Sequence, residues 1–154
     1  MPAQAPDPAT PAATLVVLDT NVVLDLWLFG DARAQPLRQA LQDGRVTALV
    51  TTPMLAELAD VLTRPFAAAW PAPPAQVLAT LHATARLVQQ PAAGPPAPRC
   101  TDTDDQKFID LAWGWPARVL FSRDRAVLKL ARAGQRRGLQ IITPERWALQ
   151  PAGA

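Results

Sequence analysis

Short apolar runs alternate with longer amphipathic segments along this chain. Residues 15–18 form a continuous apolar run rich in β-branched side chains, a pattern typical of a strand that is covered on both faces in a parallel sheet. Similar runs predict further strands at residues 46–50, 119–121 and 139–142.

Helical patterns occupy the segments between these strands. Apolar residues at helical spacing, together with start and stop signals, predict helices at residues 22–29, 33–41, 53–62, 75–90, 105–113 and 125–133. Thr52 is expected to cap the third of these helices, with Pro53 at its first position. Thr103 or Asp104 is expected to cap the fifth, and Gly134 to end the sixth.

Strands that alternate with helices predict βαβ units with right-handed crossovers. The expected fold class is therefore α/β, a three-layer α/β/α sandwich around a central parallel sheet, similar to the Rossmann arrangement. In such folds ligands bind outside the carboxyl ends of the strands, where the strand order reverses. Asp19 and Asp124 both directly follow predicted strands on that side.

The length of 154 residues fits one ordinary domain, which we expect to span residues 14–150. Residues 1–13 alternate Pro, Ala and Thr without the basic start and apolar centre of a secretory signal, so they are expected to be a disordered leader. Residues 151–154 are expected to be a tail. The Pro-rich stretches at residues 70–74 and 91–98 predict a turn and a loop within the domain.

The composition favours a soluble cytoplasmic protein. Apolar residues make up 49% of the chain, but no uncharged apolar run approaches the roughly 20 residues that a membrane span needs. The single cysteine, Cys100, cannot form an internal disulfide and suits a reducing compartment. His82 is the only histidine, so a structural zinc site of the Cys/His type is excluded.

Four acidic residues stand where the chain is expected to reverse direction or to begin a helix: Asp19, Glu57, Asp105 and Asp124. Each alone is explained by capping, by a turn or by a solvated helix face. Glu57 lies between Leu55 and Leu58 in an Ala- and Leu-rich segment, however, and a carboxylate that faces inward must be paired or metal-bound.

If these carboxylates converge, their mutual repulsion raises some of their pKa values until a cation neutralises them. Oxygen ligands of this kind select Mg²⁺ or Mn²⁺. With several carboxylates and no other evident nucleophile, the expected chemistry is metal-assisted attack of water on phosphorus.

Four segments carry a resemblance to a known family: residues 17–22 (VLDTNV), 56–58 (AEL), 102–108 (DTDDQKF) and 121–124 (FSRD). In these segments the chain resembles the PIN-domain ribonucleases, and within that family the toxin components of toxin–antitoxin systems. The resemblance spans roughly residues 15–149. It implies a PIN-like fold with a metal site built from acidic residues.

The resemblance also implies individual roles. Asp19, Asp105 and Asp124 are expected to be metal ligands, with Asp104 as the alternative to Asp105. Glu57 is expected to face the pocket as a ligand or as an acid–base group that acts through a water. Asn21 and Ser122 are expected to support the acids as polar neighbours.

Four further acidic residues are assigned weaker roles or none. Asp102 is a weaker candidate, which polarity of its loop explains. Asp25, Asp60 and Asp110 are assigned to helix surfaces, although Asp60 could reach the rim of the pocket. The chain departs from the family pattern at residues 113–116 (WGWP), which are bulkier than usual and serve either packing, base stacking or a dimer interface.

Basic residues concentrate near the C-terminus: of 15 Lys and Arg, eight fall between Arg118 and Arg146. Spacings of four, three and four residues predict one stripe on a helix, formed by Arg125, Lys129, Arg132 and Arg136. Such a stripe can follow a phosphate backbone and begins beside Asp124. A solvated helix face without a ligand is the alternative.

The leading hypothesis is therefore a Mg²⁺- or Mn²⁺-dependent endoribonuclease that hydrolyses single-stranded RNA as the toxin of a toxin–antitoxin pair. Its expected partners are RNA, a cognate antitoxin and a second copy of the chain. The alternative is a non-catalytic nucleic-acid-binding module with the same fold, and a preference for single-stranded DNA stays open. A phosphatase with an Asp nucleophile is disfavoured by Asn21, and a dinucleotide-binding domain by the absence of glycine after the first strand.

Overall fold

A computed structural model describes residues 13–91, 96–115 and 117–150 of the chain. The expected tail and all of the expected leader except Ala13 lie outside these residues, as does the middle of the loop predicted at residues 91–98. The single domain predicted for residues 14–150 stays a prediction.

Within the described residues, five parallel strands form one sheet in the order β3-β2-β1-β4-β5. The strands are β1 (Thr14–Leu18), β2 (Val46–Val50), β3 (Ala85–Leu87), β4 (Val119–Phe121) and β5 (Gln140–Ile142). Val17 of the central strand pairs with Leu49 of β2 on one side and with Leu120 of β4 on the other. The order reverses between β1 and β4, because the chain builds outward from β1 to β3 and returns to the opposite side of β1 for β4.

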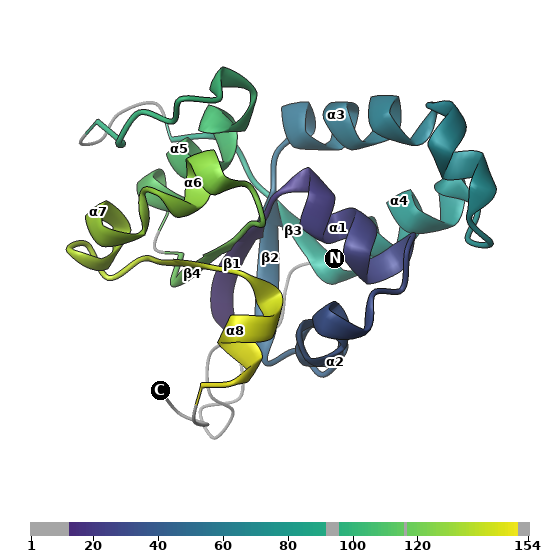
Figure 1. The fold of residues 1–154 in the computed structure, drawn as a ribbon, viewed down its shortest axis with the longest axis horizontal. Coiled ribbons are helices and arrows are strands. Elements are labelled where there is room, and N and C mark those ends of the chain that lie inside the picture. Colours follow the sequence, from purple (N-terminus) through teal and green to yellow (C-terminus); the bar gives the residue numbers. More distant parts are fainter. Residues whose placement is uncertain (1–12, 92–95, 116, 151–154) are drawn as a thin grey trace, which may run out of the picture.

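Helices enclose this sheet and are α1 (Thr20–Trp27), α2 (Gln35–Gln42), α3 (Thr52–Leu62), α4 (Pro74–Thr84), α5 (Gln106–Gly114), α6 (Arg125–Leu128), α7 (Ala131–Gln135) and α8 (Pro144–Ala148). Helix α1 contacts α2, α3 and α4, whereas α5 contacts β1 and β4, and α6 and α7 contact β5. In Figure 1 the helices α5, α6 and α7 lie to the left of β1, and α1, α3 and α4 lie to its right. The predicted three-layer α/β fold is confirmed.

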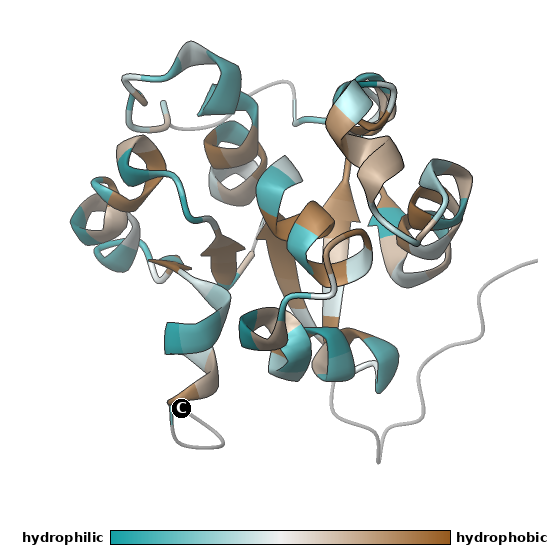
Figure 2. Ribbon diagram, turned by 45° about the vertical axis from the view of Figure 1, so that its right-hand side comes forward, coloured by the Kyte–Doolittle hydropathy of each residue, from teal (hydrophilic) through white to brown (hydrophobic). Residues whose placement is uncertain are grey.

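The buried core follows the apolar runs that predicted the strands. Val16, Val17, Leu120 and Phe121 are fully buried, and Phe108 of α5 packs with them. Figure 2 shows the apolar colour concentrated on the strands, with hydrophilic positions on the outer parts of the helices. No helix in the described ranges has the length and apolar character to cross a membrane.

The helix predicted at residues 75–90 is wrong in its last six residues. Helix α4 ends at Thr84, and Ala85–Leu87 form the edge strand β3, which pairs with β2. Arg86 and Leu87 are exposed on this edge. A strand of three residues is too short to show the alternation that distinguishes a strand from the end of an amphipathic helix.

The single helix predicted at residues 125–133 is also wrong, because the chain forms two short helices, α6 and α7. Gly134 does not end a helix but lies inside α7. A Cβ atom at Gly134 would stand 2.7 Å from the carbonyl oxygen of Leu139, so glycine there permits α7 to pack closely on β5. The glycine that follows α7 with a positive φ, of 79°, is Gly138 and not Gly134.

Two predicted helix caps are wrong, and one of these errors bears on function. Thr51, not Thr52, is the N-cap of α3. Asp102, not Thr103 or Asp104, caps the 3₁₀ turn Thr103–Asp105 by accepting a hydrogen bond from the backbone N–H of Asp104. Asp105 precedes α5, but its side chain makes no capping hydrogen bond. The carboxylate of Asp105 is therefore not used to begin the helix.

Candidate metal centre

The centre lies where the strand order reverses, between the carboxyl ends of β1 and β4. The backbone N–H of Asp19 donates to the carbonyl oxygen of Phe121 at 3.1 Å, which joins the two strand ends directly. Asp19 is only 2% exposed and is the N-cap of α1. Its carboxylate accepts hydrogen bonds from the backbone N–H of Val22 at 2.9 Å and from the hydroxyl of Ser122.

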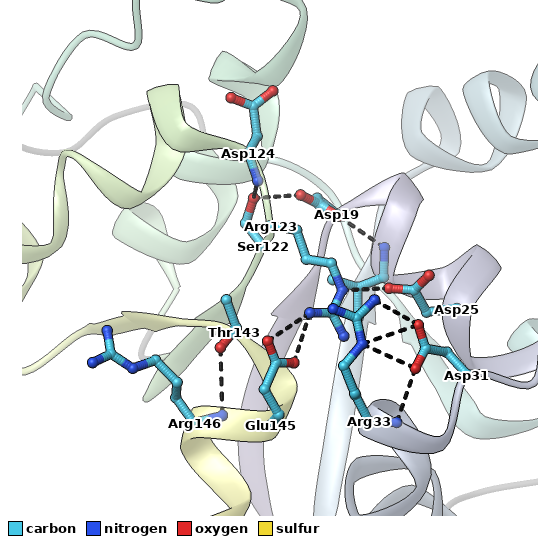
Figure 3. A network of polar contacts seen from close by, with 11 residues as sticks. Asp19, Asp25, Asp31, Arg33, Ser122, Arg123, Asp124, Thr143, Glu145 and Arg146 are labelled. Atoms are coloured by element: carbon cyan, nitrogen blue, oxygen red, sulfur yellow. Dashed lines mark hydrogen bonds and ion pairs between the residues drawn. The ribbon is translucent and has the colours of Figure 1, made fainter.

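Ser122 connects Asp19 to Asp124. The buried Ser122 hydroxyl donates to the Asp19 carboxylate and accepts from the backbone N–H of Asp124 at 3.0 Å (Figure 3). Asp124 is the N-cap of α6, and one of its carboxylate oxygens accepts from the backbone N–H of Ala126 at 2.8 Å. One hydroxyl thus fixes the positions of two of the predicted acids.

Asp124 meets two further carboxylates from the loop before α5. Asp102, Asp105 and Asp124 each offer an oxygen atom, and these atoms all lie within 4.8 Å of one another. All three residues are partly buried. The structure thus adds Asp102, the weaker candidate, to a group that contains two of the predicted ligands. The sequence signal for Asp102 is its spacing of three residues from Asp105, because side chains three residues apart face the same side of a 3₁₀ turn.

Asp104, the alternative to Asp105, is placed elsewhere. It is exposed, and its backbone carbonyl accepts a hydrogen bond from the ammonium group of Lys107. Its backbone N–H donates to the carboxylate of Asp102, so both of these contacts of Asp104 use its backbone. The structure therefore favours Asp105 over Asp104 at the third position.

Burial, and after it the neighbouring carboxylates, disfavours the charged forms of Asp19 and Asp105. Burial raises the pKa of Asp105 to about 7, and Asp124 and Asp102 add to this rise. Burial likewise raises the pKa of Asp19 to about 6, against the opposing hydrogen bonds from Ser122 and Val22, and the charge of Asp124 adds to the rise. No ion pair within the described ranges involves any of these four acids.

This donor set fits a divalent cation. Carboxylate oxygens that lie close together and lack a neutralising side chain are the ligands that Mg²⁺ and Mn²⁺ prefer. Among the described residues no Lys or Arg forms an ion pair with these acids, so the protein supplies no such neutralising partner there. Asp102, Asp105 and Asp124 could hold such an ion, with Asp19 beside Asp124.

Glu57 lies at the edge of this centre but outside the group of three. One carboxylate oxygen accepts from the ammonium group of Lys107 at 2.9 Å, and the other accepts from the hydroxyl of Thr20. The Glu57 side chain is 29% exposed, so its predicted inward orientation holds only in part. Sequence reasoning missed Lys107 and Thr20, because both act through a residue at least 37 positions away.

The other predicted residues are dispersed. Asn21 is exposed, and its side chain takes part in none of the hydrogen bonds found among the described residues. Asp60 is exposed and pairs with Arg64 at 3.4 Å, as expected for a helix surface. Asp110 is half-buried and accepts from the side chain of Gln106 at 2.9 Å.

The assignment of Asp25 to a helix surface is wrong. Asp25 is 8% exposed and accepts from Nε of Arg123 at 2.6 Å. The same guanidinium donates through Nη1 to both carboxylate oxygens of Glu145, at 2.7 and 2.6 Å. Because Arg123 stands between Ser122 and Asp124, this ion pair anchors the β4–α6 turn to α1 and α8 (Figure 3). Nothing in the sequence around Arg123 indicates these distant partners.

The predicted basic stripe is divided between two helices. Arg125 begins α6 and Lys129 caps its C-terminus, whereas Arg132 lies in α7 and Arg136 caps α7. All four side chains are exposed. They do not form the face of one continuous helix, and their role in binding nucleic acid stays a prediction.

Comparison with known proteins identifies the family. None of the curated proteins with which the chain was compared matches it. The family model of the PIN domain, whose members are generally nucleases, matches residues 15–126, which is more than half of the 154 residues and spans β1 to the start of α6. With acidic residues gathered at the carboxyl ends of β1 and β4 in a parallel five-stranded sheet, the chain belongs to the PIN-domain family.

Proposed function

We propose that this protein is a Mg²⁺- or Mn²⁺-dependent endoribonuclease that hydrolyses phosphodiester bonds in single-stranded RNA. The observation that carries the proposal is the group of Asp102, Asp105 and Asp124 beside Asp19, which lacks a neutralising cation from the protein. Structural acids are usually paired, whereas a bound cation would stabilise the charged forms of these carboxylates.

The residues of the centre have distinct tasks. Asp102, Asp105 and Asp124 hold the divalent ion, which supplies Lewis acidity for attack of water on a phosphodiester. Ser122 keeps Asp19 and Asp124 in a fixed relation, so their carboxylates are positioned before substrate arrives. Such preorganisation reduces the ordering that the reaction requires.

Glu57 and Lys107 are suited to the handling of protons and phosphate at the rim. Thr20 and Lys107 orient the Glu57 carboxylate, which is accessible enough to exchange a proton with water. Lys107 contributes a positive charge beside an otherwise acidic centre, where it can attract a phosphate oxygen. Glu57 is accordingly assigned as an acid–base group rather than as a metal ligand.

The test is cleavage of end-labelled single-stranded RNA by the purified protein with Mg²⁺, with Mn²⁺ or with a chelator. We expect cleavage with either ion, none with the chelator, and a loss of about 100-fold or more for Asp105→Asn, because a metal contributes several kcal/mol to such reactions. Asp60→Asn is the matched control, since Asp60 is exposed on α3. Cleavage that survives the chelator or the Asp105 substitution would rule out the metal mechanism.

The same assay with single-stranded DNA of equal sequence determines the nucleic-acid preference. We expect RNA to be cleaved faster. Equal cleavage of both would restrict the assignment to a nuclease for single strands. Absence of cleavage under all conditions, together with retained RNA binding, would favour the non-catalytic binding module.

We also propose that the protein is the toxin of a toxin–antitoxin pair, a role supported only by its resemblance to those PIN domains. Induced expression in a bacterial host is expected to arrest growth, and the Asp105→Asn variant is expected not to. Coexpression with the product of an adjacent small gene is expected to relieve the arrest. Equal growth of the two strains would contradict this role and would leave the nuclease assignment to the RNA assay.

A further inference from the structure

A groove lies between the C-terminal end of α5 and the helix α7. It consists of two adjoining hollows of about 360 and 520 Å³, which share Trp113 and Arg137 as lining residues. Gly114 and Trp115 line the first hollow, and Arg136 lines the second. Three described residues of the segment that departs from the family pattern, Trp113, Gly114 and Trp115, thus form a wall of this groove.

The groove is cationic and aromatic. Arg136 and Arg137 are exposed, and no acidic residue lines either hollow within the described parts of the chain. None of the ion pairs among the described residues involves Arg136 or Arg137. Two uncompensated positive charges beside an indole ring complement a ligand that carries both phosphate and a flat ring.

Arginine and tryptophan already stack on one another here. The Arg137 guanidinium lies 4.7 Å from the centroid of the Trp113 ring and donates to the Trp113 carbonyl oxygen at 3.3 Å. Arg86 lies 5.6 Å from the centroid of the Trp115 ring, whose N–H donates to the carbonyl oxygen of Gln89 at 3.0 Å. Guanidinium and indole planes held in this way are surfaces on which an unpaired base can stack.

Both walls of the groove begin at the acidic centre. Trp113 stands eight residues after Asp105 along α5, which corresponds to about 12 Å at the rise of an α-helix. The opposite wall runs from Asp124 through α6 and α7 to Arg136. In Figure 1 the helices α5, α6 and α7 lie together on the left side of the molecule. The helical segments that wall the groove, α5 and α6–α7, therefore both start next to acids of the centre, Asp105 and Asp124.

We propose that this groove is a second binding site for single-stranded RNA, which holds nucleotides that flank the phosphodiester cleaved at the acidic centre. Arg136 and Arg137 bind phosphates, and the stacked Trp113–Arg137 pair receives a base. The proposal rests on the proposed function for the identity of the strand. Because stacking and phosphate contacts carry little sequence information, the groove lengthens the footprint without selecting a sequence.

The binding test uses fluorescence anisotropy with labelled single-stranded RNA of about 12 nucleotides and the Asp19→Asn protein, so that cleavage does not interfere. Adding Arg136→Gln and Arg137→Gln is expected to raise Kd about tenfold or more, because the variant loses two phosphate contacts and the guanidinium on which a base stacks. The slope of log K against log salt is expected to shrink by about 1.4, or 0.7 for each lost phosphate contact. Both arginines are exposed, so the variants are expected to fold.

The matched control replaces two arginines outside the groove, Arg45 and Arg64, whose side chains are 61% and 59% exposed. Arg45→Gln with Arg64→Gln removes the same net charge and is expected to leave both Kd and the salt slope nearly unchanged. An equal effect of the two double variants would overturn the groove as a site and would indicate only a general loss of positive charge.

Cleavage kinetics separate this proposal from the proposed function. In the protein with an intact acidic centre, the groove variant is expected to reduce the ratio of kcat/KM for the longer RNA to kcat/KM for a trinucleotide by about tenfold. An unchanged ratio would overturn the second site while the nuclease assignment stands. Weakened RNA binding in a protein that never cleaves would retain the site and reject the nuclease.

Discussion

Two groups of acidic residues flank the same strand end, and they differ in how their charge is balanced. Asp25 and Glu145 surround the guanidinium of Arg123, at distances of 2.6–2.7 Å. One carboxylate oxygen each of Asp102, Asp105 and Asp124 lies within 4.8 Å of the others, and none of these acids pairs with a Lys or Arg among the described residues. Asp124, which directly follows Arg123, belongs to the second group, and its backbone N–H donates to the hydroxyl of Ser122 on the other side of Arg123 (Figure 3).

The contrast separates a structural ion pair from a binding site. A carboxylate paired with arginine stabilises a fixed arrangement, because each partner compensates the loss of water around the other. A group of unpaired carboxylates destabilises the free protein and is retained where a ligand supplies the missing charge. Both groups depend on one short turn, so the structural pair holds the binding site in place.

The largest expected effect is the loss of stability when the guanidinium of Arg123 is removed. Arg123→Met leaves the buried Asp25 carboxylate unpaired and is expected to lower the free energy of unfolding by about 3–5 kcal/mol, measured by urea unfolding. Arg33→Met is the control, because Arg33 pairs with Asp31 at the surface, and little change is expected. Adding Asp25→Asn and Glu145→Gln to Arg123→Met is expected to recover much of the loss. Equal losses of unfolding free energy in Arg123→Met and Arg33→Met would contradict the distinction between the structural ion pair and the unpaired acids.

The second expected effect is a loss of stability of the metal-free protein as pH rises. The folded protein holds the protons of Asp19 and Asp105 more tightly than the unfolded chain, because their pKa values rise from 3.8 to about 6 and about 7. Their contribution is therefore complete below about pH 4 and is lost between about pH 4 and 7. For the buried Asp19 the loss amounts to about 3 kcal/mol, at 1.36 kcal/mol per pKa unit.

Urea unfolding in a chelator at pH 5 and at pH 7.5 measures this effect. We expect Mn²⁺ to restore stability at pH 7.5, and Asp19→Asn to flatten the pH dependence. The pKa of Asp31, held at about 2 chiefly by its hydrogen bonds with Arg33, lies below this pH range and does not interfere. A stability that is constant or that increases from pH 5 to 7.5 in the chelator would contradict the account.

The smallest expected effect is a difference in Mn²⁺ affinity between variants of two acids in one loop, Asp102 and Asp104. Asp102→Asn is expected to weaken Mn²⁺ binding about tenfold, equal to about 1.4 kcal/mol, because Asp102 belongs to the group of three. Asp104→Asn is expected to change the affinity less than about twofold, since the Asp104 side chain is exposed and outside that group. Calorimetric titration measures both. The reverse order of effects would return Asp104 to the site.

The sequence predicts well those features that depend on neighbouring residues or on a periodic pattern of apolar residues. The apolar runs of β2 and β4 define those strands to the residue, and the acids after β1 and β4 meet because parallel strands end at the same edge of the sheet. The edge strand β3 was missed because three residues carry no clear period.

What the sequence does not predict depends on distant partners. Arg123 is 98 residues from Asp25 and 22 from Glu145, and Lys107 is 50 from Glu57. No local pattern encodes those distances. Asp102 differs, because its spacing of three residues from Asp105 places both side chains on one side of a turn. Loop polarity is the better explanation of Asp102 from the sequence alone, so the sequence indicates it only as a weaker candidate.

The most direct test of the central claim is calorimetric titration of Mn²⁺ into the metal-free protein at pH 6.5, in buffers with different ionisation enthalpies. The account predicts saturable binding that releases protons, because Asp105, with a pKa of about 7, is largely protonated before the ion binds. It also predicts that Asp105→Asn removes most of the proton release and weakens binding. Absence of saturable binding, or equal binding and proton release by the Asp105→Asn variant, would contradict the account.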